Sequence, residues 1–234
     1  MRAVARAAIA SMVMGVCATA AARPVDRLFL LFDAPETGGP TKPVAVFERE
    51  LAFEARLEAL AAGEPAVDAQ GRYAPRYLRA ALDRHVATSL LASLPVEARP
   101  ATAGDPCDGP PDAAVDDTAR GLAVSRGLLI SRVGGTARLN EAAAAEGVGE
   151  SEIARLVRRE AQAARYLDRM VTPMLAPTAL ELREAYRAPN PFRGRPFDEV
   201  RCELRRWVLA GRLGAALGEF LQSSRGRVHI SSPR

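Results

Sequence analysis

Apolar residues recur every three or four positions over most of the chain, with Glu and Arg filling the positions between them. This spacing is typical of amphipathic helices that bury one side. Prolines and glycines mark where the runs stop, as Gly63, Pro65 and Pro95 do. The pattern predicts helices over residues 44–62, 75–94, 113–131, 137–145, 151–171, 178–186 and 197–223.

Two short segments near the ends of the chain have a different pattern. The apolar run "VDRLFLLFD" (25–33) is bounded by Pro24 and Pro35 and is too short for a helix, and "GRVHIS" (226–231) alternates. We predict that residues 27–32 pair with residues 227–231. The fold class predicted is therefore mostly α, a helical core with a small two-stranded β element that joins the N- and C-terminal segments.

The pattern indicates a single domain over residues 23–234. A hydrophobic content of 48% is enough for a core, and aromatic residues make up only 5%. Residues 96–112 are rich in Pro and Gly and form a loop, and a short joint lies at 187–196. We expect the long helix 197–223 to pack against the helices at 44–62, 76–94 and 151–171.

The positive charge does not point to nucleic acid. Lys42 is the only lysine, and the arginines mostly alternate with Glu and Asp, as at Glu48-Arg49-Glu50. A nucleic-acid-binding protein would show a stripe of one sign with interleaved aromatic residues. We therefore expect no nucleic-acid partner and interpret the arginines as solvated helix faces.

The first 22 residues have the layout of a secretory signal peptide. A basic start precedes an apolar run from Ala7 to about Val16, and small residues follow at Ala18-Thr19-Ala20. Cleavage would place the protein in the periplasm or cell envelope without an integral membrane span. The alternatives are an uncleaved anchor and a lipoprotein attached at Cys17, although Met14-Gly15-Val16 fits the latter poorly.

Two cysteines remain after such a cleavage, Cys107 in the proline-rich loop and Cys202 on the last helix. In an oxidising compartment they can form a disulfide. The alternative is one free thiol in the loop and one packed thiol on the helix, and spacing alone does not decide between them.

No arrangement for catalysis or metal binding is visible in the sequence. The two histidines, His85 and His229, lie far apart, and no ligand spacing links them to the cysteines. The segment "AVSRG" (123–127) is similar to a nucleophile elbow but lies in a predicted helix, where an elbow does not form. We expect no catalytic residue, no metal, no cofactor and no enzyme activity.

Several of these segments resemble the SurA-type periplasmic chaperones and foldases. The C-terminal segment "FDEVRCELRRWVLAGRLGAALGEFLQSSRGRVHIS" is similar at Phe197, Val200, Leu204, Leu217, Val228 and Ile230. The capped helix "PTALELREAY" is similar at Thr178, Glu181, Leu182 and Tyr186. Two further similar segments are "EGVGESEIARLVRREAQAARYLDRMV", which precedes the capped helix, and the first strand "VDRLFLLFD". The resemblance implies the family's helical chaperone core. It covers residues 25–95 and 147–231 loosely, and 176–231 best.

The chain departs from this family at one place. Most relatives carry a parvulin-type prolyl isomerase domain after the capped helix, whereas only Arg187 to Pro196 separate Tyr186 from Phe197 here. The resemblance therefore implies a chaperone without isomerase activity. Isomerase activity remains the only enzymatic alternative.

The function expected is ATP-independent binding of unfolded or extended envelope polypeptides. Tyr73, Tyr77 and Phe192 are the candidate peptide-binding residues, if their aromatic rings are exposed. A second hypothesis is a non-catalytic structural or adaptor protein, with a homodimer left open. A contiguous apolar groove would favour polypeptide clients, and a flat apolar patch would favour assembly.

Overall fold

The computed structural model describes residues 26–97, 107 and 117–231, and it is mostly helical. The predicted signal segment 1–22, with Cys17, lies outside the described residues, as does nearly all of the 96–112 loop. Among the described residues, no helix is both long and apolar enough to cross a bilayer. The helices are α1 (Glu48–Ala61), α2 (Pro75–Ser93), α3 (Asp117–Val133), α4 (Thr136–Ala145), α5 (Glu150–Tyr166), α6 (Thr172–Leu175), α7 (Ala179–Arg187) and α8 (Phe197–Arg225).

The sheet has three antiparallel strands, β1 (Leu28–Asp33), β2 (Val44–Phe47) and β3 (His229–Ser231), in the order β2-β1-β3. Pairing of the two terminal segments is confirmed, with Phe32 opposite Ile230. The prediction of only two strands is wrong, because residues 44–47 form β2 instead of the first turn of a helix. Their side chains satisfy a helical pattern equally well, but pairing with β1 holds the backbone extended.

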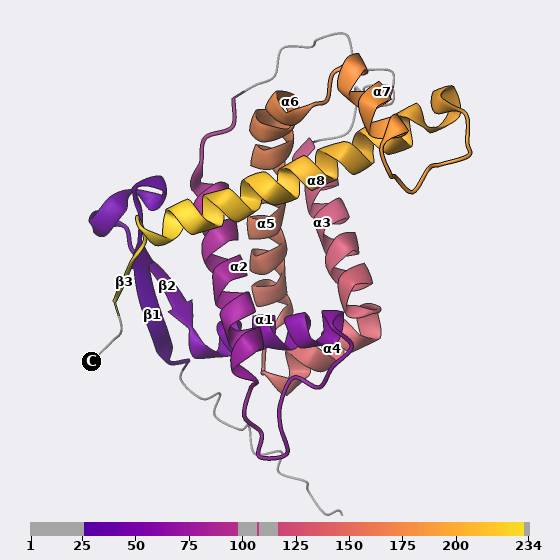
Figure 1. Ribbon diagram of the computed structural model, residues 1–234. Coiled ribbons are helices and arrows are strands. Elements are labelled where there is room, and N and C mark those ends of the chain that lie inside the picture. Colours follow the sequence, from indigo (N-terminus) through magenta and orange to yellow (C-terminus); the bar gives the residue numbers. More distant parts are fainter. Residues whose placement is uncertain (1–25, 98–106, 108–116, 232–234) are drawn as a thin grey trace, which may run out of the picture.

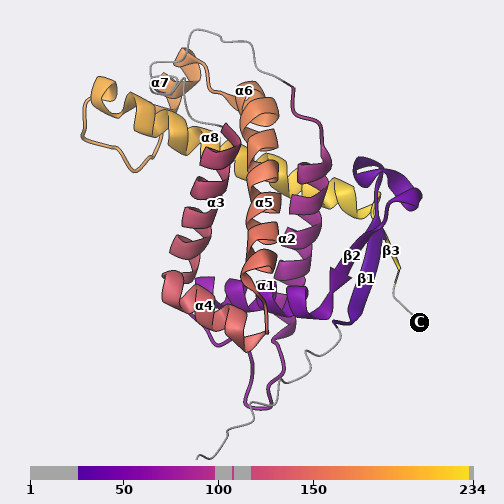
Figure 2. The same cartoon turned by 180° about the vertical axis from the view of Figure 1, so that it is seen from behind.

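Three long helices form a layer, with α5 between α2 and α3 (Figures 1 and 2). Helix α1 crosses one end of this layer and contacts α2, α3 and α4. One hydrophobic cluster joins the sheet to α1 and α2 through residues such as Phe32 and Leu51, and a second joins α1 to α3, α4 and α5. The two faces of α1 thus connect the two halves of the core.

Helix α8 crosses one face of this layer, and Figure 1 shows it running from α7 to the sheet. It packs most closely on α6 and α7, which was not predicted, and it reaches α2 as predicted, where Arg225 lies 3.3 Å from Asp83. Its buried apolar residues are Val200 and Leu204, near its N-terminal end. Further along, Gly211, Gly214 and Gly218 lie so openly that an added Cβ would contact nothing. These glycines lie on the exposed side of α8, whereas Leu213, Leu217 and Leu221 face the helical layer.

The segment that links α5 to α8 is held by local interactions. A π-helical turn (Leu167–Val171) ends α5, and the predicted capping box begins α7: Thr178 Oγ1 accepts from the Glu181 amide at 3.3 Å. The joint is folded back, because the Tyr186 hydroxyl donates to the Arg195 carbonyl and its ring packs edge-on against Phe197.

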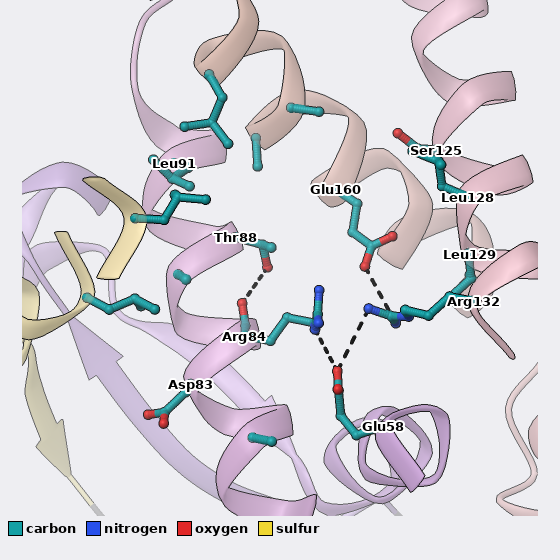
Figure 3. Close-up of a pocket in the computed structure, with 17 residues that line it drawn as sticks. Glu58, Asp83, Arg84, Thr88, Leu91, Ser125, Leu128, Leu129, Arg132 and Glu160 are labelled. Atoms are coloured by element: carbon teal, nitrogen blue, oxygen red, sulfur yellow. Dashed lines mark hydrogen bonds and ion pairs between the residues drawn. The ribbon is translucent and has the colours of Figure 1, made fainter. Parts of the chain in front are cut away.

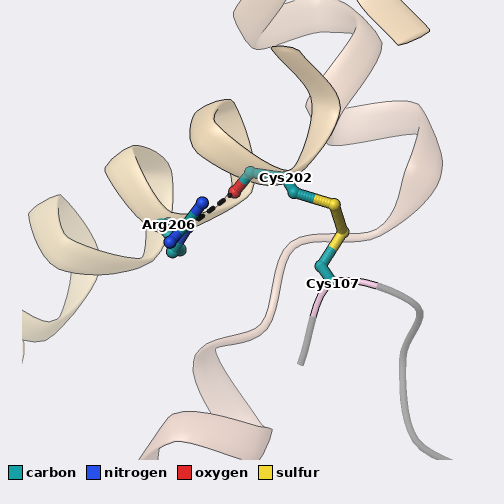
Figure 4. The surroundings of a disulfide bond; sticks show 3 residues. All are labelled: Cys107, Cys202 and Arg206. Atoms are coloured by element: carbon teal, nitrogen blue, oxygen red, sulfur yellow. Dashed lines mark hydrogen bonds between the residues drawn. A yellow bond between two sulfur atoms is a disulfide. The ribbon is translucent and has the colours of Figure 1, made fainter. Parts of the chain in front are cut away.

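A disulfide joins Cys107 to Cys202, with a Cα–Cα distance of 5.2 Å (Figure 4). The free-thiol alternative is therefore wrong for both residues. The bond links the connection between α2 and α3 to the first turns of α8. It is consistent with an oxidising compartment outside the cytoplasm.

Reduction of the disulfide should lower the free energy of unfolding by about 4 kcal/mol, because the bond closes a loop with a sequence separation of 95 residues. Urea denaturation with and without a thiol-free reductant measures this difference. The double variant Cys107→Ser/Cys202→Ser is the control and should be insensitive to the reductant. An equal shift in that variant would show that the effect does not arise from this bond.

Two phenylalanines on β1 provide a matched test of the sheet packing. Phe32 is fully buried and contacts His85 edge-on, whereas Phe29 is 40% exposed. Phe32→Ala should cost about 4 kcal/mol of unfolding free energy, and Phe29→Ala less than about 1 kcal/mol. Equal losses in denaturant titrations would contradict the assignment of the buried face.

Candidate functional site

A groove with a volume of about 580 Å³ lies between α2, α3 and α5, and the C-terminal half of α8 borders it (Figure 3). We call it the central groove. Its apolar walls come from four helices: Leu91 on α2, Leu128 and Leu129 on α3, Leu167 after α5, and Leu217 and Leu221 on α8. The groove is thus enclosed by elements that lie far apart in the sequence.

Small side chains explain why this space stays open. Helix α2 contributes Ala80 and Ala87, and α5 contributes Ala163 and Ala164. An alanine ends at Cβ, so the helices can meet at their backbones and still leave room above these positions. The larger Leu128 projects from α3 and is 66% exposed.

One end of the groove is charged. Arg84 Nε lies 2.6 Å from Glu58 Oε1, and Arg132 lies 3.8 Å from Glu58 and 3.9 Å from Glu160 (Figure 3). Burial raises the pKa of the Glu160 carboxyl by more than the nearby Arg132 and Arg84 lower it. This end therefore resists filling by apolar side chains, because they would strip water from these charges.

A second charged cluster is buried behind this end and joins α1, α2 and α5. His85 Nδ1 lies 3.0 Å from Glu54 Oε1, and Arg159 donates to Glu54 and, at 3.0 Å, to Glu50. Burial alone would raise the pKa of Glu54, but the hydrogen bond from His85 and the charge of Arg159 outweigh it and lower that pKa. The carboxylate is thus ionised and holds three helices together.

Glu50, Glu54 and His85 also place three potential metal-ligand atoms within 4.8 Å of one another. Arg159 already faces all three, since its Nη1 also lies 3.4 Å from His85 Nε2. A cation would have to displace this guanidinium group, so the arrangement fits an ion-pair network better than a metal centre.

Two smaller hollows continue the central groove. One, the side groove, has a volume of about 350 Å³, lies between α3 and α5 and shares Ser125, Leu128 and Ala164 with the central groove. The other, of about 200 Å³, lies under α8 and shares Leu91, Leu167 and Leu217 with it. We call these three neighbouring, largely apolar hollows the depression along α5.

The predicted peptide-binding residues do not line this depression. Tyr77 is buried in the core against the sheet, so its proposed exposure is wrong. Tyr73 is half-buried, and its hydroxyl contacts Glu146 and Arg56. Phe192 is half-buried in the joint before α8. The residues that do line the groove were not predicted from the sequence, although the spacing of Val124 and Leu128, one turn apart in a predicted helix, was visible in it.

The comparisons with known proteins add no assignment: no family model, curated protein or solved structure matches this chain. The resemblance described above therefore stays a prediction.

Two glutamates test the electrostatics of the site in opposite directions. At pH 7, Glu54→Gln should lower the free energy of unfolding by about 3 kcal/mol, because it leaves Arg159 buried beside a neutral partner. Because the pKa of Glu54 is lowered in the fold, its carboxylate stabilises the protein fully above pH 4.5, the ordinary pKa of a glutamate. This stabilisation is lost as the pH falls further and the carboxylate takes up a proton. The difference between wild type and this variant should therefore shrink in acid.

Glu160→Gln should instead leave stability unchanged or increase it at pH 7. The raised pKa of Glu160 means that its ionised form destabilises the fold progressively as pH rises above 4.5. Denaturant titrations of both variants between pH 3 and 8 measure these trends, on the order of 1–3 kcal/mol. The same pH dependence in both variants would refute the assigned shifts.

Proposed function

We propose that the protein is an exported, ATP-independent chaperone-like protein that binds unfolded or extended envelope polypeptides without isomerase chemistry. The observation that carries this proposal is the largely apolar depression along α5, which consists of the central groove and the two hollows beside it. The concave shape favours a polypeptide client, because a self-associating adaptor would be expected to present a flat patch.

The chemistry of the groove is suited to weak and reversible binding. Each Leu or Phe side chain buried from water contributes about 1.5–3 kcal/mol, and ordering the bound segment offsets much of this gain. Two or three inserted side chains would therefore be held without a folding step or an energy source. Because the walls are alanine and leucine side chains, they select apolar character and not a particular sequence.

The place of action we propose is the periplasm or cell envelope. The N-terminal signal pattern and the disulfide between Cys107 and Cys202 support it. In that compartment, where ATP is absent, the protein would meet polypeptides that have crossed the inner membrane and are still unfolded.

A non-catalytic adaptor function is the second candidate. Three large apolar side chains, Met174, Leu180 and Trp207, are exposed on α6, α7 and α8. A second copy that covered them would bury these groups from water. Sedimentation of the purified protein distinguishes the two, since a stable dimer that Trp207→Glu dissociates would favour the adaptor.

Filling the groove tests the chaperone proposal. Ala164 is exposed and borders both the central and side grooves, so Ala164→Trp should fill the space without disturbing the core. We expect it to reduce protection of a urea-unfolded outer-membrane β-barrel protein, measured by light scattering on dilution. A loss of affinity on the order of tenfold would correspond to about 1.4 kcal/mol.

The matched control is Ala210→Trp, which adds the same side chain at an exposed position on α8 away from the described grooves. It should protect as well as wild type. If wild type gives no protection in molar excess, or both variants lose it equally, the proposed function is wrong.

A further inference from the structure

At the charged end of the central groove, a donor and an acceptor face each other across a gap. Arg132 Nη2 lies 3.9 Å from Glu160 Oε1, and Nη1 of the same guanidinium group lies 3.8 Å from Glu58 Oε1 (Figure 3). Both distances are longer than a hydrogen bond. Arg132 Nε is buried and has no hydrogen-bond partner among the described residues. Glu58, by contrast, accepts a hydrogen bond from Arg84 at 2.6 Å.

A ligand in the groove can reach both side chains. Arg132 on α3 is 24% exposed and Glu160 on α5 is 17% exposed, and both line the central groove. Burial raises the pKa of Glu160 by more than the nearby arginines lower it, which agrees with a carboxylate that is short of partners. A ligand that supplies a donor to Glu160 and an acceptor to Arg132 therefore removes a cost that the fold carries without it.

The charges at this end of the groove favour a neutral ligand group. Two carboxylates and two guanidinium groups lie together there: Glu58, Glu160, Arg84 and Arg132. Asp83, the remaining charged residue of the lining, pairs with Arg225. A cationic ligand group would lie beside the arginines and an anionic one beside the glutamates. A neutral group that both donates and accepts meets neither repulsion.

We propose that this end of the central groove binds the backbone of an extended polypeptide, with Glu160 accepting from the N–H group and Arg132 donating to the C=O group of one residue. This inference rests on the proposed function and specifies how the same site holds its clients. A strand residue that pairs with another exchanges both of these bonds with it. Standard bond lengths place the backbone N and O of one extended residue about 3 Å apart, close to the 3.9 Å between the two side-chain atoms.

Contact with the backbone suits a site that binds many sequences. Every residue except proline offers one N–H and one C=O group. In a folded protein these groups are already paired, so the site distinguishes unfolded chains from folded ones. The primary amide of Asn or Gln carries the same two functions. The leucines that line the rest of the groove favour the backbone, because they bind apolar side chains beside the contact.

The test scans the backbone of a fluorescent peptide. The peptide has eight residues, Leu, Ser and Thr with a single Phe to fix its register, and contains no Asn or Gln. In a series of analogues, one peptide bond at a time is replaced by an ester, which removes an N–H group and keeps the side chains. Fluorescence anisotropy with the wild-type protein should show about tenfold weaker binding for the ester at the residue that contacts Glu160.

Two variants of Glu160 locate this effect. Glu160→Leu removes the acceptor, so it should weaken the all-amide peptide about tenfold and abolish the ester penalty, although it makes the groove more apolar. Glu160→Gln should retain the penalty, because its carbonyl oxygen still accepts. Glu219→Leu is the matched control, with the same change at an exposed position on α8 outside the described grooves, and should bind like wild type. Thermal melts establish that all three variants are folded.

Each outcome has a distinct meaning. An ester scan without a penalty, or equal penalties in wild type and Glu160→Leu, would overturn the backbone contact and leave the chaperone proposal intact. Tight binding only after a Gln is added to the peptide, with no ester penalty, would assign the site to side-chain amides instead. No binding of any peptide, together with no protection of the unfolded barrel protein, would refute the proposed function itself.

Discussion

The ion pair between Glu54 and Arg159 fixes the arrangement of the helices. Together with His85, it connects α1, α5 and α2 inside a mostly apolar interior. Charges taken out of water are costly unless they are paired, so the fold is held to the geometry in which these groups meet. A shift of one helix by a turn would separate these groups and leave buried charges without partners, which adds to the cost of disrupting the apolar packing.

The open groove follows from this constraint. With α2 and α5 tied to α1, the alanines at positions 87, 163 and 164 lie where larger residues would close the space. The charges of Glu58, Arg84, Arg132 and Glu160 oppose collapse at one end, because apolar side chains that filled the space there would remove water from them. The depression is thus a product of the packing and needs no ligand to hold it open.

Local features could be predicted from the sequence, and features set by distant contacts could not. The cap at Thr178 depends on residues three apart, and the pattern of β1 identified it as a strand. The extended segment at Val44 depends on pairing with β1, and the burial of Tyr77 depends on how α2 meets the sheet.

The order of the strands has a consequence for how the chain is made. β1 lies in the middle of the sheet, yet its partner β3 comes at residues 229–231, almost the full length of the chain later. During synthesis the N-terminal part of a chain emerges first. The edge of the apolar strand β1 that pairs with β3 therefore stays unpaired until residues 229–231 have been made. Such an unpaired edge is a template for association with other chains, so the nascent protein itself passes through the aggregation-prone state that we propose it relieves in its clients.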